Sequence, residues 1–155
     1  MEHVTASYLR QAWDKNDWLY DGQHGFRLGY SRECPVITVC QDSVDCMDKG
    51  DRIDAIVMDF SKAFDFVPHD RLLMKIAISG ADSRVVAWVR EFLLGRTERV
   101  KVGEVVWEEV RVKSGVPQGS VLGPHLFLAY VNDIWRNTEA TIRLFDYDCV
   151  IYTNI

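Results

Sequence analysis

The chain has 155 residues, of which 48% are apolar and 26% are charged, and its formal net charge is -5. This composition is typical of a globular protein and argues against a disordered chain. The length fits one domain with a core of its own. Charges interrupt every apolar run that approaches the length of a membrane span, and the first residues lack the layout of a secretory signal. The sequence therefore favours an intracellular protein, in the cytoplasm or the nucleus.

Helical periodicity, capping residues and terminal glycines predict five helices, and a glycine-containing loop or short strand is expected over residues 21–30. The helices are expected over residues 3–15, 31–49, 70–79, 82–94 and 120–136. The four cysteines form no C-x-x-C pair, so free thiols are favoured over a zinc site or a disulfide framework.

Three segments predict strands. Residues 53–60 form a short, nearly continuous apolar run, which indicates a strand buried on both faces. Alternating residues 99–102 and 110–112, around a Gly103–Glu104 turn, predict a hairpin. Residues 142–152 predict a strand, a turn and a second strand, with acidic residues in the middle. The mixed order of helices and strands predicts an α+β or α/β core, with helices packed on a sheet.

Acidic residues lie at the end of one predicted strand and in the middle of another. Asp59 ends the first strand, and Asp146 and Asp148 lie within Leu-Phe-Asp-Tyr-Asp-Cys-Val. If the strands are neighbours, their carboxylates meet and offer the oxygen ligands that Mg²⁺ prefers. Two such ions perform in-line phosphoryl transfer. Ordinary turn residues are the alternative interpretation of the same acids.

Four blocks make the chain resemble the reverse transcriptase of non-LTR (LINE-like) retrotransposons. They occur in the order of that family and cover nearly the whole chain, and FLLGRTERV (92–100) between them also looks typical. The blocks are QHGFRLGYS (23–31), DFSKAFDFVPHDRLL (59–73), SGVPQGSVLGPHLFLAYVNDI (114–134) and RLFDYDCVIY (143–152). The second and third blocks are long and specific.

The resemblance implies a fold and an activity. The fold is the fingers and palm part of a right-hand polymerase, with an antiparallel palm sheet packed by helices; residues 1–52 would belong to the fingers and residues 53–155 to the palm with its inserted pocket elements. The activity is RNA-directed DNA polymerisation, in which deoxynucleotides are added to a primer 3′-hydroxyl with two Mg²⁺ or Mn²⁺ ions. The partners would be an RNA template, a DNA primer and deoxynucleoside triphosphates.

The resemblance also implies residue roles. Asp59 and Asp148 would be catalytic and would bind metal, with Asp146 as a further metal ligand. Phe64 would lie under the incoming sugar and exclude a 2′-hydroxyl; a plain core aromatic is the alternative. The remaining nucleotide-pocket residues would be Gly115, Gln118, Gly119 and Ser120, with free N–H groups at the following helix; a helix-capping turn is the alternative. Contacts to nucleic acid or triphosphate would come from Arg27, Arg96 and Arg99, for which solvated surface positions are the alternative.

The fourth block departs from the family pattern. The family has F-A-D-D where this chain has Phe145, Asp146, Tyr147 and Asp148, so Tyr147 occupies the position of the first aspartate of that pair. A phenol is protonated at neutral pH and is a poor Mg²⁺ ligand. In extended chain, neighbouring residues point to opposite faces, so Asp146 and Asp148 would share a face and Asp146 would not replace the missing ligand without a bulge.

Two hypotheses follow, with a third that has weaker support. The chain is expected to end before the thumb of the polymerase, and with Tyr147 this favours a catalytically silent member of the family. The alternative to an active polymerase is a catalytically dead retroelement-derived remnant, or a fragment retained for binding nucleic acid or protein. A different two-metal enzyme, such as a nuclease of the RNase H type, rests on the acidic residues alone.

Overall fold

The computed structural model of the chain describes residues 1–27 and 33–155. These residues divide into two compact units, each built from segments that are distant in the sequence. The first, called the helical unit, comprises residues 1–18 and 64–130; the second, called the sheet unit, comprises residues 19–63 and 131–155. Both contain helices and strands, so the mixed α+β class is confirmed. The fingers and palm division at residue 52 stays a prediction.

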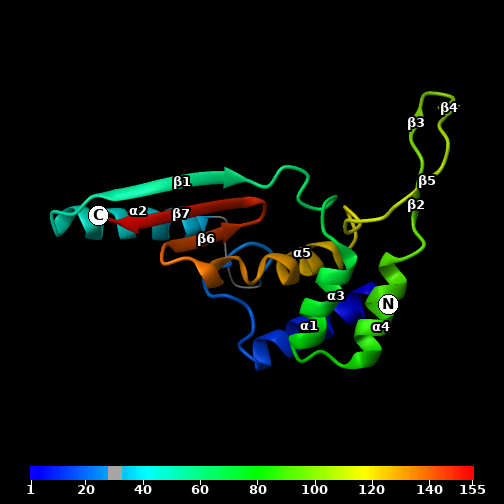
Figure 1. Cartoon of the computed structure of the whole chain (residues 1–155), viewed down its shortest axis with the longest axis horizontal. Coiled ribbons are helices and arrows are strands. Elements are labelled where there is room, and N and C mark those ends of the chain that lie inside the picture. The colour runs from blue at the N-terminus through cyan, green and yellow to red at the C-terminus, as the bar shows by residue number, and fades with distance from the viewer. Residues whose placement is uncertain (28–32) are drawn as a thin grey trace. The chain divides into compact units, whose positions relative to one another are not determined.

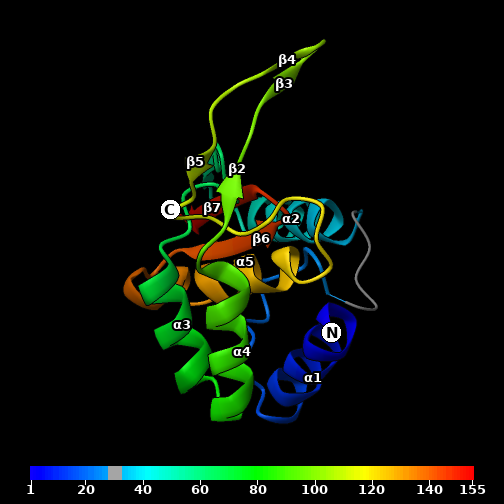
Figure 2. The ribbon, with the colours of Figure 1, turned by 90° about the vertical axis from the view of Figure 1, so that its right-hand side faces the viewer.

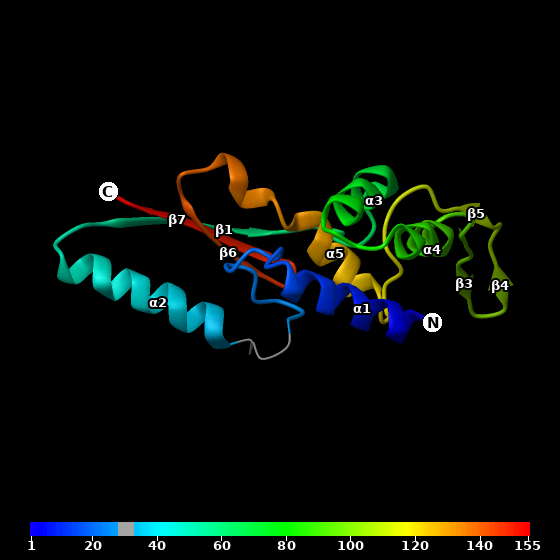
Figure 3. The ribbon, with the colours of Figure 1, turned by 90° about the horizontal axis from the view of Figure 1, so that it is seen from below.

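The sheet unit is built on a three-stranded antiparallel sheet with strand order β1–β7–β6 (Figure 1). The strands are β1 (Ile53–Asp59), β6 (Thr141–Phe145) and β7 (Asp148–Asn154). Helix α2 (Glu33–Asp48) lies along one face of this sheet (Figure 3). The side chain of Asp42 in α2 accepts hydrogen bonds from Arg143 of β6 and from the Tyr152 hydroxyl of β7. The predicted strand–turn–strand segment and its antiparallel pairing are confirmed. The expected start of the second helix, at residue 31, lies outside the described residues.

The two edges of this sheet differ. Along β6, the Leu144 amide donates to the Gly22 carbonyl (2.8 Å) and the His24 amide donates to the Leu144 carbonyl (3.0 Å), so a short segment covers that edge. In contrast, β1 is an edge strand that is exposed from Asp54 to Asp59. The prediction that this strand is buried on both faces is therefore wrong. The apolar run that suggested burial belongs to a strand with β7 on one side and no strand on the other within the described residues.

The helical unit packs four helices around an aliphatic and aromatic core. They are α1 (Glu2–Lys15), α3 (His69–Ile78), α4 (Ser83–Leu93) and α5 (Gly123–Val131), of which α5 has its last residue in the sheet unit. Helices α3 and α4 lie side by side (Figure 2). Trp13 of α1 is buried, and its indole N–H donates to the Ser79 hydroxyl at 2.9 Å. None of the helices among the described residues combines the length and apolarity needed to cross a membrane.

The last predicted helix differs most from the structure. The helix expected over 120–136 is shorter: α5 begins at Gly123, next to Pro124, and ends at Val131, and a separate short 3₁₀ helix, η1 (Ile134–Asn137), follows. Proline favours the first helical turn because its nitrogen needs no hydrogen-bond acceptor there. After α5, the buried Asn132 side chain accepts a hydrogen bond from the Tyr20 amide (2.8 Å), an interaction that periodicity does not reveal.

The predicted hairpin forms a two-stranded arm over residues 97–111. Its short strands are β2 (Thr97–Glu98), β3 (Lys101–Val102), β4 (Val105–Val106) and β5 (Val110–Arg111); β2 pairs with β5 and β3 pairs with β4. The turn at Gly103–Glu104 is confirmed by the pairing of Val102 with Val105. The valines of the arm are exposed, so its strand propensity and turn, rather than a core, maintain the hairpin.

Candidate active site

Strands β1 and β7 bring two of the predicted acidic residues to one end of the sheet. Asp59 lies opposite Asp148 in the antiparallel register, as the last pair of β1 with β7. Both residues are exposed. Directly opposed residues in antiparallel strands have Cβ atoms roughly 5 Å apart. The structure therefore places the predicted catalytic pair of the sheet unit side by side.

The turn between β6 and β7 consists of Asp146 and Tyr147, and Asp146 has a left-handed backbone with φ of 48°. Asp146 is thus a turn residue, and the expectation that it shares a strand face with Asp148 is wrong, because the extended geometry on which it relied ends at Phe145. The Tyr147 carbonyl accepts a hydrogen bond from the Phe60 amide at 2.8 Å. The Tyr147 ring meets the edge of the Phe26 ring with centroids 5.9 Å apart.

The carboxylates of this unit do not fit a two-ion centre. Within the described ranges, no three acidic, histidine or cysteine side chains gather closely enough to hold a metal ion. Asp59 and Asp148 provide two carboxylates. Tyr147, the turn residue directly before Asp148, provides only a phenol. A two-metal centre needs carboxylates that bridge both ions, and two carboxylates beside a phenol do not supply them. The metal-binding roles of Asp59, Asp146 and Asp148 stay predictions.

The first block of the resemblance packs against the same turn. Gly25 lies so close to Asp146 that a Cβ atom on Gly25 would be 2.2 Å from the Asp146 backbone nitrogen. Arg27, predicted to contact nucleic acid or triphosphate, donates to the Tyr20 carbonyl at 3.3 Å. Burial, together with the charges of Arg143 and Arg27, lowers the pKa of His24 from its ordinary value. The sequence marks this block, but no local pattern in it indicates the contact of Gly25 with Asp146, 121 positions later.

In the helical unit, backbone hydrogen bonds join the second and third blocks. The Gly115 amide donates to the Val67 carbonyl and the Val116 amide donates to the Phe64 carbonyl, each at 2.8 Å. The Ser114 hydroxyl donates to the Asp65 carbonyl at 2.9 Å. Gly115 has a φ of 89°, and a Cβ atom there would lie 2.7 Å from the Phe64 carbonyl oxygen. Only glycine fits this position, because a left-handed backbone and a close approach coincide.

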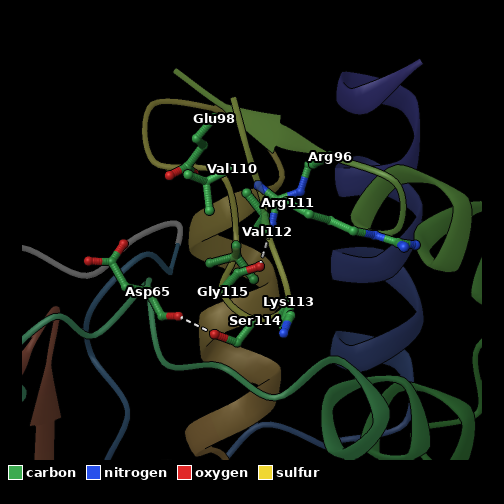
Figure 4. Close-up of a pocket in the computed structure, with 10 residues that line it drawn as sticks. Asp65, Arg96, Glu98, Val110, Arg111, Val112, Lys113, Ser114 and Gly115 are labelled. Atoms are coloured by element: carbon green, nitrogen blue, oxygen red, sulfur yellow. Dashed lines mark hydrogen bonds between the residues drawn. The ribbon is translucent and has the colours of Figure 1, made fainter. Parts of the chain in front are cut away.

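The carbonyl oxygen of Gly115 accepts two side-chain hydrogen bonds. One comes from Arg96 Nη2 at 2.6 Å and one from the buried His69 Nε2 at 2.8 Å. Arg96 also donates to the Leu93 carbonyl at 3.2 Å, and burial lowers its pKa. Figure 4 shows Arg96 turned toward Gly115 at a cavity of about 220 Å³, whose lining also includes Arg111 and Lys113. Neither His69 nor the Arg96 contact was anticipated from the sequence.

Phe64 and Arg99 have contacts within the helical unit that fit the alternative interpretations, a core aromatic for Phe64 and a surface position for Arg99. Phe64 is 7% exposed, and its ring meets the edge of Phe127 of α5 at 5.5 Å between centroids. Arg99 forms an exposed ion pair with Glu109 at 2.5 Å, and exposed pairs contribute little to stability. The roles of Phe64 under the sugar and of Arg99 on nucleic acid stay predictions.

The rest of the predicted nucleotide pocket is a turn before α5. Gln118 and Gly119 are exposed. The Ser120 hydroxyl accepts a hydrogen bond from the Gly123 amide at 2.9 Å, as a helix cap does. The Val121 amide donates to the Glu2 carboxylate at 3.0 Å. The amides expected to be free for phosphate are thus satisfied here by a carboxylate and a hydroxyl.

The predicted residues therefore fall into two groups in different compact units. Asp59, Asp146, Asp148 and Arg27 belong to the sheet unit; the pocket residues and the other two arginines belong to the helical unit.

Comparison with known proteins gives the class of this framework. A family model described as reverse transcriptase (RNA-dependent DNA polymerase) matches residues 1–154. The chain is 30% identical over 141 residues to the RNA-directed DNA polymerase from mobile element jockey of Drosophila melanogaster, which covers 91% of this chain and 15% of that protein. It is 31% identical over 112 residues to the probable RNA-directed DNA polymerase from transposon X-element of the same species, covering 72% of this chain and 12% of that protein. The chain therefore belongs to the reverse transcriptase family.

The particular branch is also confirmed. A probable RNA-directed DNA polymerase from transposon BS of Drosophila melanogaster is 29% identical over 133 residues, or 86% of this chain and 15% of that protein. With the two relatives above, it supports the resemblance to non-LTR retrotransposon reverse transcriptases. The chain spans about 15% or less of the length of these curated relatives.

Proposed function

We propose that residues 1–155 form the strand framework and nucleotide-pocket loop of an RNA-directed DNA polymerase, and that this chain itself does not polymerise. The proposed partners of the active family framework are an RNA template, a DNA primer and deoxynucleoside triphosphates. The proposed loss of activity rests on one observation. Tyr147, next to the opposed Asp59 and Asp148, occupies a carboxylate position and packs on Phe26.

The chemistry at the end of the sheet supports this proposal. Asp59 and Asp148 present hard oxygen ligands at neighbouring strand ends, and such ligands suit Mg²⁺ or Mn²⁺. A neutral phenol cannot complete the set of charged metal ligands, and the Tyr147 ring packs edge-on against Phe26. A single cation held by two carboxylates would be bound weakly, because affinity falls with the number of charged ligands.

The helical unit supplies the second part of the proposal. The hydrogen bonds between Phe64, Val67 and the loop at Gly115 and Val116 fix the segment before the pocket residue Gln118. In this proposal Phe64 limits space beside the sugar, and Gln118, Gly119 and Ser120 line the nucleotide. This framework does not depend on Tyr147, so loss of metal chemistry would leave it folded.

The test combines metal binding with primer extension. Mn²⁺ binding is measured by calorimetry for the wild-type chain, for Tyr147→Asp and for Tyr147→Asn, which has nearly the same shape as aspartate without its charge. We expect Tyr147→Asp to bind Mn²⁺ at least about tenfold more tightly than the other two. Adding Asp59→Asn to Tyr147→Asp should abolish that gain. Equal affinities for all variants would remove the assignment of position 147 to the metal site.

Primer extension on an RNA template tests directly whether the chain lacks polymerase activity. The wild-type chain should extend no DNA primer with either Mg²⁺ or Mn²⁺. Extension by the wild type that disappears in Asp59→Asn would show that the chain is an active polymerase after all.

A non-catalytic role in nucleic-acid binding is the second candidate. Exposed Arg111 and Lys113 line the cavity beside the Ser114–Val116 loop, and cations of this kind bind phosphates in a salt-dependent manner. Binding of an RNA–DNA primer–template is measured against salt concentration for the wild type and for Arg111→Ala with Lys113→Ala. The double variant should bind more weakly and with a smaller salt slope. Identical curves would eliminate this surface.

A further inference from the structure

One peptide plane of the pocket loop is held from both sides. Its N–H, on Val116, donates to the Phe64 carbonyl at 2.8 Å. Its carbonyl, on Gly115, accepts from His69 Nε2 at 2.8 Å and from Arg96 Nη2 at 2.6 Å. A trans peptide is planar, and its N–H and C=O point in opposite directions. These three hydrogen bonds together therefore fix the rotation of the plane.

The residue at the start of this plane is a glycine, and the plane therefore needs to be held. Gly115 has a φ of 89°, and the close approach of the Phe64 carbonyl leaves no room for a Cβ atom. Because glycine rotates more freely than any other residue, the plane that follows Gly115 would turn at little cost if nothing held its carbonyl. The side-chain donors supply the restriction that glycine itself lacks.

The two donors come from two different helices of the helical unit. His69 is the first residue of α3 and is 6% exposed. Arg96 follows the end of α4 and also donates to the Leu93 carbonyl at 3.2 Å, so it joins the last turn of that helix to the loop. A carbonyl oxygen has two lone pairs, and the Gly115 oxygen uses both. The orientation of the loop is thus set by the packing of α3 and α4.

The chain after this plane passes the orientation on to the pocket. Val116 is buried, with 4% of its surface exposed, and Pro117 follows it. The proline ring fixes its own φ and restricts the residue before it to extended backbone. Few freely rotating bonds therefore separate the held plane from Gln118, which is exposed. A turn of the plane would move Gln118 away from its present position.

We propose that His69 and Arg96 are positioning residues of the nucleotide pocket, which hold the peptide plane after Gly115 so that Gln118 meets a deoxynucleoside triphosphate. This role rests on the pocket of the proposed function and adds the two side chains that preset it. Neither side chain touches the nucleotide, and Arg96 acts through the loop instead of by direct contact with phosphate. Without the donors, the loop has the binding orientation for only part of the time, and the apparent affinity falls by that fraction.

Titration of the isotope-labelled chain with dATP, followed by NMR with a chelator present, measures the affinity of the pocket without metal. In the wild type, dATP should shift the signals of Gln118 and its neighbours. His69→Leu and Arg96→Met each remove one donor and should each raise the dissociation constant about threefold, and the double variant should raise it at least about tenfold. His69→Gln should match the wild type, because the glutamine amide can donate to the same carbonyl.

Two controls separate positioning from a general loss of stability and from direct contact with phosphate. Ser79→Ala removes the acceptor of the Trp13 indole in the same unit, so it also loses a buried hydrogen bond but should leave the dissociation constant for dATP unchanged. The ratio of the Arg96→Met and wild-type dissociation constants should be the same at low and high salt. A direct contact of Arg96 with phosphate would instead make that ratio fall as salt increases.

The outcomes distinguish this role from the pocket on which it rests. A wild type that binds no dATP at residues 115–120 would overturn the pocket and this role with it. Binding by the wild type that His69→Leu and Arg96→Met leave unchanged would overturn the positioning role alone. An equal loss of affinity in Ser79→Ala, or a loss in Arg96→Met that disappears at high salt, would also overturn it. Each single variant keeps one donor, so the single variants decide the test if the double variant does not fold.

Discussion

Gly25 packs directly against the backbone of Asp146, across 121 positions of sequence. A Cβ atom on Gly25 would lie 2.2 Å from the Asp146 nitrogen and 2.9 Å from its Cα. These are backbone atoms of a two-residue turn whose Tyr147 carbonyl already holds the Phe60 amide, so they cannot move aside without disturbing β1 and β7. The glycine of the first block thus fixes the position of the turn that precedes Asp148.

Gly25→Ala should therefore destabilise the chain by about 3 kcal/mol, at the upper end of the cost of overpacking. Urea denaturation measures the change. Gly50→Ala is the matched control: it has open space around the Cβ position and a φ of 81°, so backbone strain alone should cost about 1 kcal/mol. If the two variants lost the same stability, the close approach of Gly25 would not be limiting.

The shared acceptor at Gly115 predicts coupling between His69 and Arg96. Each single change, His69→Ala or Arg96→Met, leaves the buried Gly115 carbonyl one donor, whereas the double variant leaves it none. Because an unsatisfied buried carbonyl costs more than a lost hydrogen bond, the double variant should lose about 1 kcal/mol more than the sum of the singles. A double-mutant cycle in urea measures this, and additive losses would contradict it. Arg99→Met, which breaks an exposed pair with Glu109, should leave the free energy of unfolding nearly unchanged, because exposed ion pairs contribute little.

Contacts between distant segments, such as those of Gly25 and Gly115, could not be predicted from the sequence, whereas local elements could. Helical spacing and caps correctly located α1, α3 and α4, because those signals lie within a few residues of each other; Asp82, for example, accepts from the Arg84 amide at the start of α4. The sequence predicted that Asp59 and Asp148 would meet if their strands were neighbours, and the pairing of β1 with β7 places them opposite each other. The burial of β1 was predicted wrongly, since an apolar strand has the same sequence at an edge and in a sheet centre. The contact of Gly25 with Asp146 joins distant segments and leaves no local pattern.

The surroundings of His125 predict a loss of stability at acidic pH. Arg10 Nη2 lies 3.0 Å from His125 Nε2, and His125 Nδ1 lies 3.2 Å from the Val121 carbonyl. Arginine can only donate, so Nε2 accepts and the ring is neutral. Burial, and next the charge of Arg10, lower the pKa of His125 in the folded chain.

With a folded pKa below the unfolded value of about 6.5, the unfolded chain takes up the proton first as the pH falls. Stability is therefore present above pH 6.5 and is lost progressively below it, until the folded pKa is reached. Urea midpoints between pH 8 and pH 5 should fall less steeply for His125→Gln than for the wild type. His3→Gln, at an exposed position of α1, should match the wild type. A pH profile unchanged by His125→Gln would rule out this histidine as a source of the loss. His24, whose pKa is also lowered, should contribute to the slope that remains in His125→Gln.

The opposed carboxylates of Asp59 and Asp148 should repel each other when no cation is present. Like charges directly opposite in antiparallel strands are unfavourable by about 0.2–1 kcal/mol, and both residues are exposed at the end of the β1–β7 ladder. Asp148→Asn keeps the shape and removes one charge, so in the presence of a chelator it should raise the free energy of unfolding by about that amount.

Salt should shrink the difference, because the interaction between exposed charges is screened. Asp54→Asn is the matched control: it removes an exposed carboxylate of the same strand that lies opposite Thr153, and its effect should be smaller. Mn²⁺ should stabilise the wild type more than Asp148→Asn, because a cation bound between two carboxylates is attracted to both and offsets their mutual repulsion. If Asp148→Asn destabilised the chain at low salt, the two carboxylates would have to be separated or neutralised by other groups. The predicted repulsion between Asp59 and Asp148 would then be wrong.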